Sequence, residues 1–328
     1  MSELRFGLQI TNVELPRLRD IGQAAEELGF HTLYLPDHIV HEGPERQHDP
    51  HHLSYDVMIQ AALLAEATRR VQVGHLVLCN LFRHPVMTAQ SLATLDHLRG
   101  GRAVAGLGSG WTETEFRMTG IPYPDIATRL RMLDEALTCM RSLWTNEQTT
   151  FEGEFYRFRD AILWPKPVQK PHPPIVLGGS GRGLLRVAAR HADVVNVIAE
   201  VGKGGYIAMA NVGRLTDEAF RSKIRFLREE ATRHGRDAAG IRISTVAFTT
   251  IITDSPAATR ATAETFGRML GLEPEGVLCA PLALIGTPEE CVAELRRRAR
   301  EWQVTEFVFP YTGDETTRRL AQEVLARL

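Results

Sequence analysis

The sequence has no large excess of either charge and no long apolar run. Its 38 lysine and arginine residues nearly balance 40 aspartate and glutamate residues, and the formal net charge is −2. This balance gives no support for binding to nucleic acid or to an anionic membrane surface. No apolar run reaches the roughly 18 residues of a membrane-spanning helix, and the opening MSELRFGLQI lacks the basic-then-apolar layout of a signal peptide. We therefore expect a cytoplasmic protein that contacts neither membranes nor nucleic acid.

Cysteine is also scarce, and the motifs of several enzyme classes are missing. The four cysteines, none of them in C-x-x-C spacing, are Cys79, Cys139, Cys279 and Cys291. This spacing argues against a zinc ribbon or a redox pair and favours free, mostly buried thiols. No G-x-S-x-G motif of a serine hydrolase is present. Histidines crowd positions 38–52 without one coherent ligand spacing, so we expect no metal site.

What the chain does contain is an alternation of short apolar runs and amphipathic stretches from end to end. Strands are predicted at 6–10, 32–35, 71–78, 103–107, 175–177, 194–197, 242–252 and 306–309. Helical spacing fills most of the intervals, with a hairpin at 149–158 and a glycine-rich stretch at 200–211 as excursions. No early strand is followed by a G-x-G-x-x-G turn, which favours a closed barrel over an open doubly wound sheet. The sequence predicts an α/β fold, a single (β/α)8 barrel domain over 1–328 with insertions at the C-terminal face.

Two candidate segments follow the second and third predicted strands. Asp37 and His38 come directly after the second strand, at the end that faces the active site in such barrels. A histidine there can transfer a proton or hydrogen-bond a cofactor ring, because its pKa lies near working pH. The alternative is a helix-capping aspartate beside a surface histidine. The stretch 74–85 is longer than a plain turn needs, and it is either part of a site or an ordinary loop.

Two glycine-rich turns follow the fourth and fifth predicted strands. Residues 106–111 read GLGSGW, where glycines let a planar ring or a phosphate approach the backbone and Trp111 offers a flat wall. Residues 178–181 read GGSG and open the next helix, where backbone N–H groups and the Ser180 hydroxyl form a phosphate cradle. The alternative for the second turn is a tight turn with a serine N-cap.

Taken in order, several segments of the chain resemble the luciferase-like monooxygenase superfamily, and in particular its actinobacterial branch of oxidoreductases dependent on coenzyme F420. They are GFHTLYLPDH, NLFRHPVMTAQSLATLDHLRGGRAVAGLGSGW, RLRMLDEALTCMRSLW, FEGEFYRF, WPKPVQKPHPPIVLGGSG and LIGTPEECVAEL. The resemblance runs nearly the whole length and implies a (β/α)8 barrel with insertions over the strand ends.

The resemblance also implies roles for matching positions. Asp37, His38 and Glu115 are the candidate catalytic residues, with His38 able to serve proton transfer. Leu76 and Val77 align with a bulge that carries a non-proline cis peptide behind the cofactor ring in similar proteins. The full set implied to bind the cofactor is Asp37, His38, Leu76, Val77, Asn80, Gly108, Ser109, Gly110, Trp111, Arg129, Gly178, Gly179, Ser180 and Gly181.

The function implied is hydride transfer between a deazaflavin, coenzyme F420, and a small, moderately apolar organic substrate. One alternative is an FMN-dependent monooxygenase supplied by a separate flavin reductase; another is a flavin-binding protein without turnover. A sugar-phosphate dehydrogenase of the family has a catalytic glutamate where this chain has Trp111, which argues against that substrate. Family habit implies a homodimer, and loops at 41–52, 200–211 and 273–283 are expected to cover the site.

Overall fold

The computed structural model describes residues 4–40, 51–98, 100–200 and 213–328. In this part of the chain, parallel strands form a closed barrel, because β3 pairs with β5 as well as with β2. Around the barrel the strands are β1 (Arg5–Gln9), β2 (Thr32–Leu35), β3 (Gln72–His75), β5 (Ala103–Gly108), β8 (Ile175–Gly178), β9 (Val194–Asn196), β10 (Arg242–Val246) and β13 (Val304–Pro310). A two-residue strand, β4 (Leu78–Cys79), continues β3 along β5 after a break. The predicted (β/α)8 barrel is confirmed.

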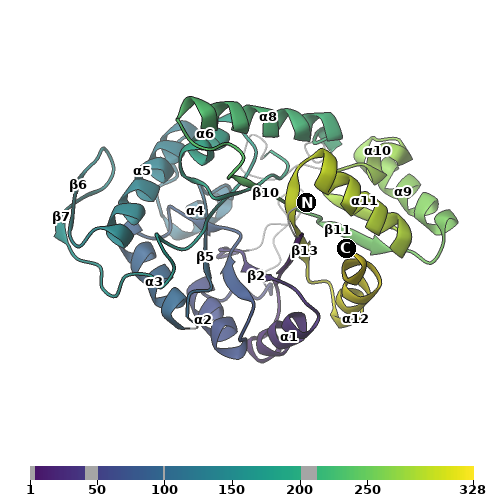
Figure 1. Cartoon of the computed structure of the whole chain (residues 1–328), viewed down its shortest axis with the longest axis horizontal. Helices are drawn as coiled ribbons and strands as arrows, with labels where there is room; N and C mark the ends of the chain where they lie inside the picture. Colours follow the sequence, from purple (N-terminus) through teal and green to yellow (C-terminus); the bar gives the residue numbers. More distant parts are fainter. Residues whose placement is uncertain (1–3, 41–50, 99, 201–212) are drawn as a thin grey trace.

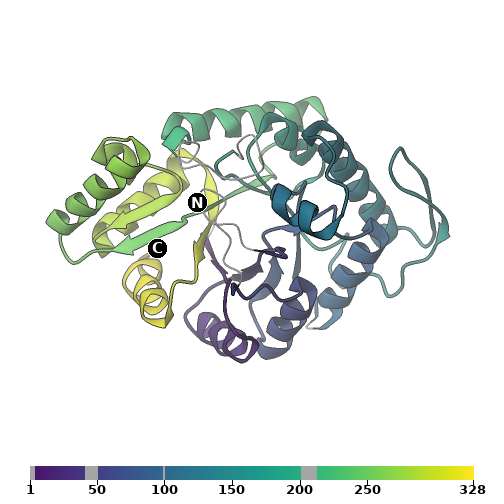
Figure 2. The ribbon, with the colours of Figure 1, turned by 180° about the vertical axis from the view of Figure 1, so that it is seen from behind.

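Helices surround the barrel on its outside (Figures 1 and 2). They include α1 (Leu15–Glu27), α2 (Val57–Ala67), α3 (Pro85–Leu98), α5 (Ile126–Thr145), α6 (Arg182–His191), α8 (Asp217–Arg233), α11 (Pro288–Glu301) and α12 (Asp314–Arg319). Their starts follow from local chemistry: the Asp56 and Asp125 side chains cap α2 and α5, and Thr287 and Glu290 form a capping box at α11. The chain ends in a π-helical turn (Leu320–Val324) and a 3-10 turn (Leu325–Arg327). No helix in the described ranges is long and apolar enough to cross a membrane.

Additional elements interrupt the βα alternation. The predicted hairpin is present as β6 (Thr149–Glu152) and β7 (Arg157–Ala161), and it projects from one end of the molecule (Figure 1). At the opposite end, β11 (Thr249–Ile252) and β12 (Ala283–Gly286) form a small parallel sheet beside α9 (Pro256–Leu270) and α10 (Pro274–Leu278). The single strand predicted over 242–252 is therefore two strands in different sheets. A short helix, α4 (Glu113–Thr119), lies in front of the strands in Figure 2.

The inside of the barrel is packed with side chains rather than open. Its apolar residues come from successive strands and are Tyr34, Leu76, Val104, Val176, Val194, Val246 and Val308. The Tyr34 hydroxyl donates to Glu306 Oε1 over 2.7 Å, and both side chains are buried. Burial is the main reason why the pKa values of Tyr34 and Glu306 are raised. Because this packing blocks the barrel from within, a ligand has access only at the ends of the strands.

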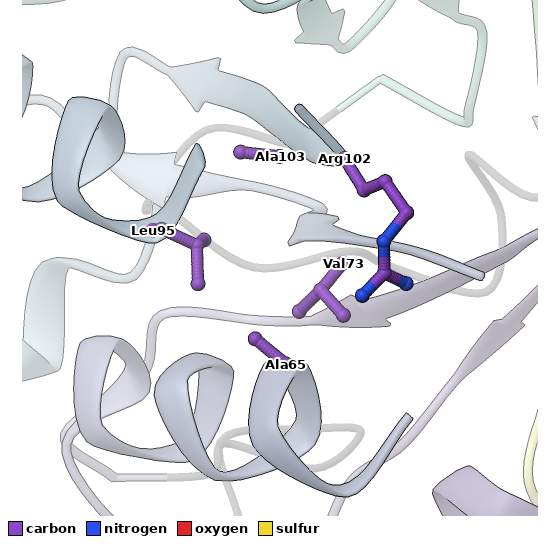
Figure 3. Close-up of a pocket in the computed structure, with 5 residues that line it drawn as sticks. All are labelled: Ala65, Val73, Leu95, Arg102 and Ala103. Carbon is purple, nitrogen blue, oxygen red and sulfur yellow. The ribbon is translucent and has the colours of Figure 1, made fainter. Parts of the chain in front are cut away.

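One small space remains between the barrel and its surrounding helices. Figure 3 shows a small internal pocket between α2, α3 and the strands β3 and β5. Its volume is about 10 Å³, and its lining consists of Ala65, Val73, Leu95, Arg102 and Ala103. This is about the smallest space that holds one water molecule. As predicted, the cysteines are free thiols, and all but Cys279 are buried.

Candidate functional site

A large cavity opens at the carboxyl ends of the barrel strands, where the sequence predicted a site. Its volume is about 1110 Å³, slightly above the range of roughly 300–1,000 Å³ that is usual for ligand pockets, so it has room for a cofactor together with a substrate. The structure brings most of the predicted residues into its lining: Asp37, His38, Leu76, Val77, Gly108, Ser109, Gly110, Trp111, Glu115, Arg129, Gly178, Gly179, Ser180 and Gly181. They come from the ends of several strands and from α4 and α5, so the barrel itself holds most of the site in place.

The floor of the cavity is formed by the break between β3 and β4. The Leu76-Val77 peptide bond is cis, as the family resemblance implied. Two glycines flank Val77 closely. A Cβ atom on Gly108 would lie 2.6 Å from Val77 Cγ2, and one on Gly178 would lie 2.9 Å from Val77 Cγ1. The Gln9 side chain donates to the Leu76 carbonyl over 3.1 Å. Glycine at 108 and 178 therefore leaves room for the Val77 side chain to project as a floor for a planar ligand.

Asp37 connects the end of β2 to the loop after β4. Its Oδ2 accepts the Cys79 backbone N–H over 3.0 Å and an N–H of Arg83 over 2.6 Å. Arg83 also contacts Asp56, the N-cap of α2, over 3.3 Å. Burial raises the pKa of the Asp37 carboxyl, although the Arg83 guanidinium opposes this shift. One oxygen of Asp37 thus holds both partners, which makes it an anchor for the loop beside the cavity floor.

His38 faces Glu115, which comes from α4. Both carboxylate oxygens of Glu115 lie 3.3 Å from His38 Nδ1. Oε1 also accepts the backbone N–H groups of Ile39, over 2.5 Å, and Val40, over 3.3 Å. The Glu115 side chain is almost fully buried, whereas that of His38 is 24% exposed. The centroids of the His38 and Trp111 rings lie 5.4 Å apart, and the two ring planes are at 84° to each other. Glu115 therefore fixes both the His38 side chain and the backbone that follows it.

The glycine-rich turn after β8 leads into α6, as predicted. Gly181 is the N-cap of α6, and no side chain caps this helix end, so first-turn N–H groups face outward for a ligand. Gly179 has a φ of 134°, and a Cβ there would lie 2.4 Å from Leu184 Cδ2. The Ser180 hydroxyl donates to the Ile198 carbonyl. That hydroxyl proton is already engaged within the protein, so backbone groups are the donors left at this turn.

Arg129 of α5 lies at the same side of the cavity as α6. It is only 8% exposed, and one N–H donates to the Pro124 carbonyl over 2.6 Å. Its guanidinium carbon lies 4.0 Å from the centre of the Tyr123 ring, while its Nε is buried without a hydrogen-bond partner. The Tyr123 hydroxyl in turn donates to the Trp111 carbonyl over 2.9 Å. A buried guanidinium with an unused donor beside a helix N-terminus fits an anionic group such as a phosphate.

Some predicted residues are not brought into the cavity. The Asn80 side chain donates to the Tyr156 hydroxyl over 3.1 Å and does not line the cavity. Residues 273–283 form α10 and the start of β12 and line no part of the cavity, so the predicted covering loop there is wrong. The other two predicted covering loops, 41–52 and 200–211, lie mostly outside the described residues. No group of three or more potential metal ligands occurs in the described ranges.

The cavity also contains residues that sequence reasoning missed. They include Gln9, Thr11, Cys79, Glu113, Tyr123, Asn196, Ile198, Val246, Phe248 and Pro310. Most of them stand at the carboxyl end of a strand, where an end-of-strand rule would have selected them. Tyr123 is different, because it belongs to the loop between α4 and α5, for which the sequence offered no pattern.

These features define a parallel (β/α)8-barrel protein with a ligand cavity at the carboxyl ends of its strands. Residues 4–272 match the family described as luciferase-like monooxygenase. Because the match covers most of the chain, the protein belongs to this family, whose members include flavin- and F420-dependent oxidoreductases and monooxygenases.

Similar proteins differ in the cofactor that their names give. The chain is 36% identical over 196 residues, 58% of its length, to an F420-dependent glucose-6-phosphate dehydrogenase of Microbacterium testaceum. It is 36% identical over 186 residues, 56% of its length, to an FMNH2-dependent dimethylsulfone monooxygenase of Pseudomonas putida. The matches span 55% and 49% of those relatives. Its fold is similar to that of the coenzyme F420-dependent tetrahydromethanopterin reductase of Methanopyrus kandleri, with a TM-score of 0.76, 20% identity and 99% of both chains covered.

Proposed function

We propose that the protein is a coenzyme F420-dependent oxidoreductase that transfers a hydride to or from a small organic substrate. The observation that supports a flavin or deazaflavin is the combination of the Val77 floor with a partly unpaired Arg129 in the same cavity, and the choice of F420 rests on the F420-dependent relatives. A planar ring that bears a phosphate on a side chain matches both features. The deazaflavin supplies hydride chemistry when bound, and the protein supplies orientation and exclusion of water.

Named residues would hold such a cofactor. Val77, with Gly108 and Gly178 beside it, would support the ring, and Ser109 and Gly110 at the end of β5 would contact the ring or the ribityl chain. The phosphate would meet the N-terminus of α6 and the Arg129 guanidinium. Asp37 would hold β4 and the loop after it in place through Cys79 and Arg83 rather than touch the ring. His38 would exchange a proton with the substrate.

The cavity lining supports an uncharged substrate. Apart from Arg129 and His38, no basic side chain lines the cavity in the described ranges. The lining away from Arg129 is mostly apolar and includes Trp111, Ile198, Val246, Phe248 and Pro310, while its charged side chains are mainly carboxylates such as Glu113 and Glu115. A phosphorylated sugar of the kind named for the Microbacterium relative would need a second cationic subsite. We therefore propose a neutral, moderately apolar substrate, with the hydroxyl or carbonyl oxygen at His38.

A second candidate function is an FMN-dependent monooxygenase. Its support is the similarity to the FMNH2-dependent enzyme of Pseudomonas putida, at the same identity as to the F420-dependent relative. This function would require a flavin reductase as partner. Under either function we propose a cytoplasmic homodimer whose chain forms one domain over residues 1–328.

Titration of the purified protein with coenzyme F420 and, separately, with FMN tests the proposal. Quenching of cofactor fluorescence measures binding, and we expect a micromolar or lower Kd for F420 and a much higher Kd for FMN. The reverse preference would favour the monooxygenase, and no binding of either cofactor would refute both functions.

Two variants show whether the phosphate site is the one proposed here. Arg129→Met keeps the length of the side chain over Tyr123 but loses a charge-assisted hydrogen bond of about 1.5–3 kcal/mol, so Kd should rise by about ten- to hundredfold. Arg131→Met on the same helix is the matched control, because Arg131 is exposed and pairs with Glu154 away from the cavity. Its Kd should not change. An unchanged Kd for Arg129→Met would contradict the assignment of the phosphate site.

A further inference from the structure

We infer that Glu115 is a positioning residue that fixes the tautomer of His38, with the proton on Nδ1 and the lone pair of Nε2 directed to the cavity. This inference rests on the proposed function in one respect only, namely that His38 exchanges a proton with the substrate. The arrangement of the two side chains stands independently of the cofactor.

The direction of the hydrogen bond between His38 and Glu115 follows from the other partners of Glu115. An ionised carboxylate only accepts hydrogen bonds, and Glu115 Oε1 already accepts from the backbone N–H groups of Ile39 and Val40. Both Glu115 oxygens lie 3.3 Å from His38 Nδ1. In a neutral imidazole one nitrogen carries the proton and the other accepts. Nδ1 must therefore be the N–H donor, and Nε2 carries the lone pair.

The ring of His38 has a defined orientation. His38 lines the cavity, and its Nδ1 edge is turned toward the buried carboxylate. Nε2 lies across the ring from that edge and is the nitrogen directed away from Glu115. The edge contact with Trp111 further restricts rotation of the imidazole. The orientation of the His38 ring does not depend on a hydrogen bond to Nε2, so Nε2 stays available to a substrate.

The helix that carries Glu115, α4, is held in place by contacts of its own. Phe116, the next residue of α4, stacks on Tyr123 with ring centres 4.5 Å apart and planes at 26°. Helix α4 ends at Gly120, whose backbone N–H donates a hydrogen bond to the Phe116 carbonyl. Glu115 is therefore held by packing that does not involve His38, and the carboxylate can determine the histidine rather than follow it.

The consequence for the reaction is a defined proton acceptor. When a substrate hydroxyl lies at Nε2, its O–H bond breaks and an Nε2–H bond forms, while the electron pair stays on the substrate oxygen. The imidazole becomes positively charged, and the Glu115 carboxylate lies next to that charge. In the opposite direction, Nε2–H returns the proton to the oxygen.

Nuclear magnetic resonance on the cofactor-free protein labelled with ¹⁵N-histidine tests this inference without turnover. The two ring nitrogens have different ¹⁵N chemical shifts when protonated and unprotonated, and loss of signals in His38→Asn identifies those of His38 among the 12 histidines. We expect the wild-type protein at pH 8 to carry the His38 proton on Nδ1. A proton on Nε2 would overturn the inference whatever the variants do.

Glu115→Gln provides the second measurement. Its carbonyl oxygen can still accept the Ile39 N–H, but its NH₂ group is a donor toward Nδ1, so we expect the His38 proton to move to Nε2. Glu147→Gln, which is exposed and lies outside the cavity lining, is the matched control and should leave the proton on Nδ1. A proton that stays on Nδ1 in Glu115→Gln would show a merely structural role. Failure of both cofactors to bind would refute the proposed function but leave this result unaffected.

Discussion

Gly108 is the residue at which one added methyl group should have the clearest effect on the site. An alanine Cβ at this position would lie 2.6 Å from Val77 Cγ2, about 0.8 Å closer than ordinary contact begins at 3.4 Å. Val77 can relieve this clash only by leaving its present position, either toward the space beside Gly178 or into the cavity. Gly108→Ala must therefore displace the floor of the cavity.

The magnitude follows from the cost of overpacking. Inserting a methyl group into a well-packed site costs about 1–3 kcal/mol. The reduced freedom of the unfolded chain returns about 0.4–1 kcal/mol of this when glycine becomes alanine. We therefore expect Gly108→Ala to lower the free energy of unfolding by about 1–2 kcal/mol in urea titrations followed by circular dichroism. Gly276→Ala in α10 is the control, because its Cβ would meet Leu272 Cβ at 3.7 Å, which is an ordinary contact, and it should not lower the free energy of unfolding.

A double-mutant cycle decides whether the Val77 contact is the cause. In Val77→Ala the nearest atom to the new methyl group at position 108 is the Cβ of residue 77, 3.8 Å away, which is ordinary contact. Adding Gly108→Ala to Val77→Ala should then cost nothing, giving a coupling energy of about 1–2 kcal/mol. Equal losses in both backgrounds would refute the steric argument, and so would a single variant as stable as the wild type.

Three further predictions concern buried ionisable side chains. Arg298→Met should lower the free energy of unfolding by about 3–5 kcal/mol in urea titrations, because the fully buried guanidinium donates to four backbone carbonyls; a loss below about 1 kcal/mol would contradict this. Burial raises the pKa of Glu306 in the folded protein, so the charged form of this carboxyl opposes folding at pH values above its pKa in the unfolded chain. Glu306→Gln should therefore be more stable than the wild type at pH 8, and this advantage should fade toward pH 4. A difference that stays constant with pH would exclude the argument. Burial lowers the pKa of His75 to about 3, so protonation of the unfolded chain should destabilise the wild type below about pH 6.5; His75→Leu should lose less stability between pH 7.5 and pH 5, and equal losses would show that another group is responsible.

The barrel was predictable because each of its strands and helices carries its own local signal. The strand at 32–35 and the helix at 85–98 have the predicted bounds, the helix because a proline suits its first turn. The excursions were harder. β12 is a four-residue run that starts at the last residue of the predicted loop 273–283 and was not predicted as a strand, and its partner β11 is distant in sequence. Pairing of this kind depends on tertiary packing, which periodicity does not report.

The candidate site was predictable by position but not by direction. Cys79 and Asn80 are neighbours at the end of β4, yet only Cys79 lines the cavity, because the Asn80 side chain donates to the Tyr156 hydroxyl instead. The Ser180 hydroxyl was expected to bind a ligand, but its proton goes to the Ile198 carbonyl. The pairing of His38 with Glu115 joins residues 77 positions apart, and no local pattern announces it.

The described residues on either side of positions 41–50 contact the rest of the protein through their main chain. Before these positions, the backbone N–H groups of Ile39 and Val40 donate to Glu115; after them, the Leu53 N–H donates to Asn12 Oδ1 over 3.0 Å. All of these donors are main-chain groups, which every residue type except proline provides. The side chains of Ile39, Val40 and Leu53 are thus open to exchange during evolution at little cost to these contacts, as long as none of the three becomes proline.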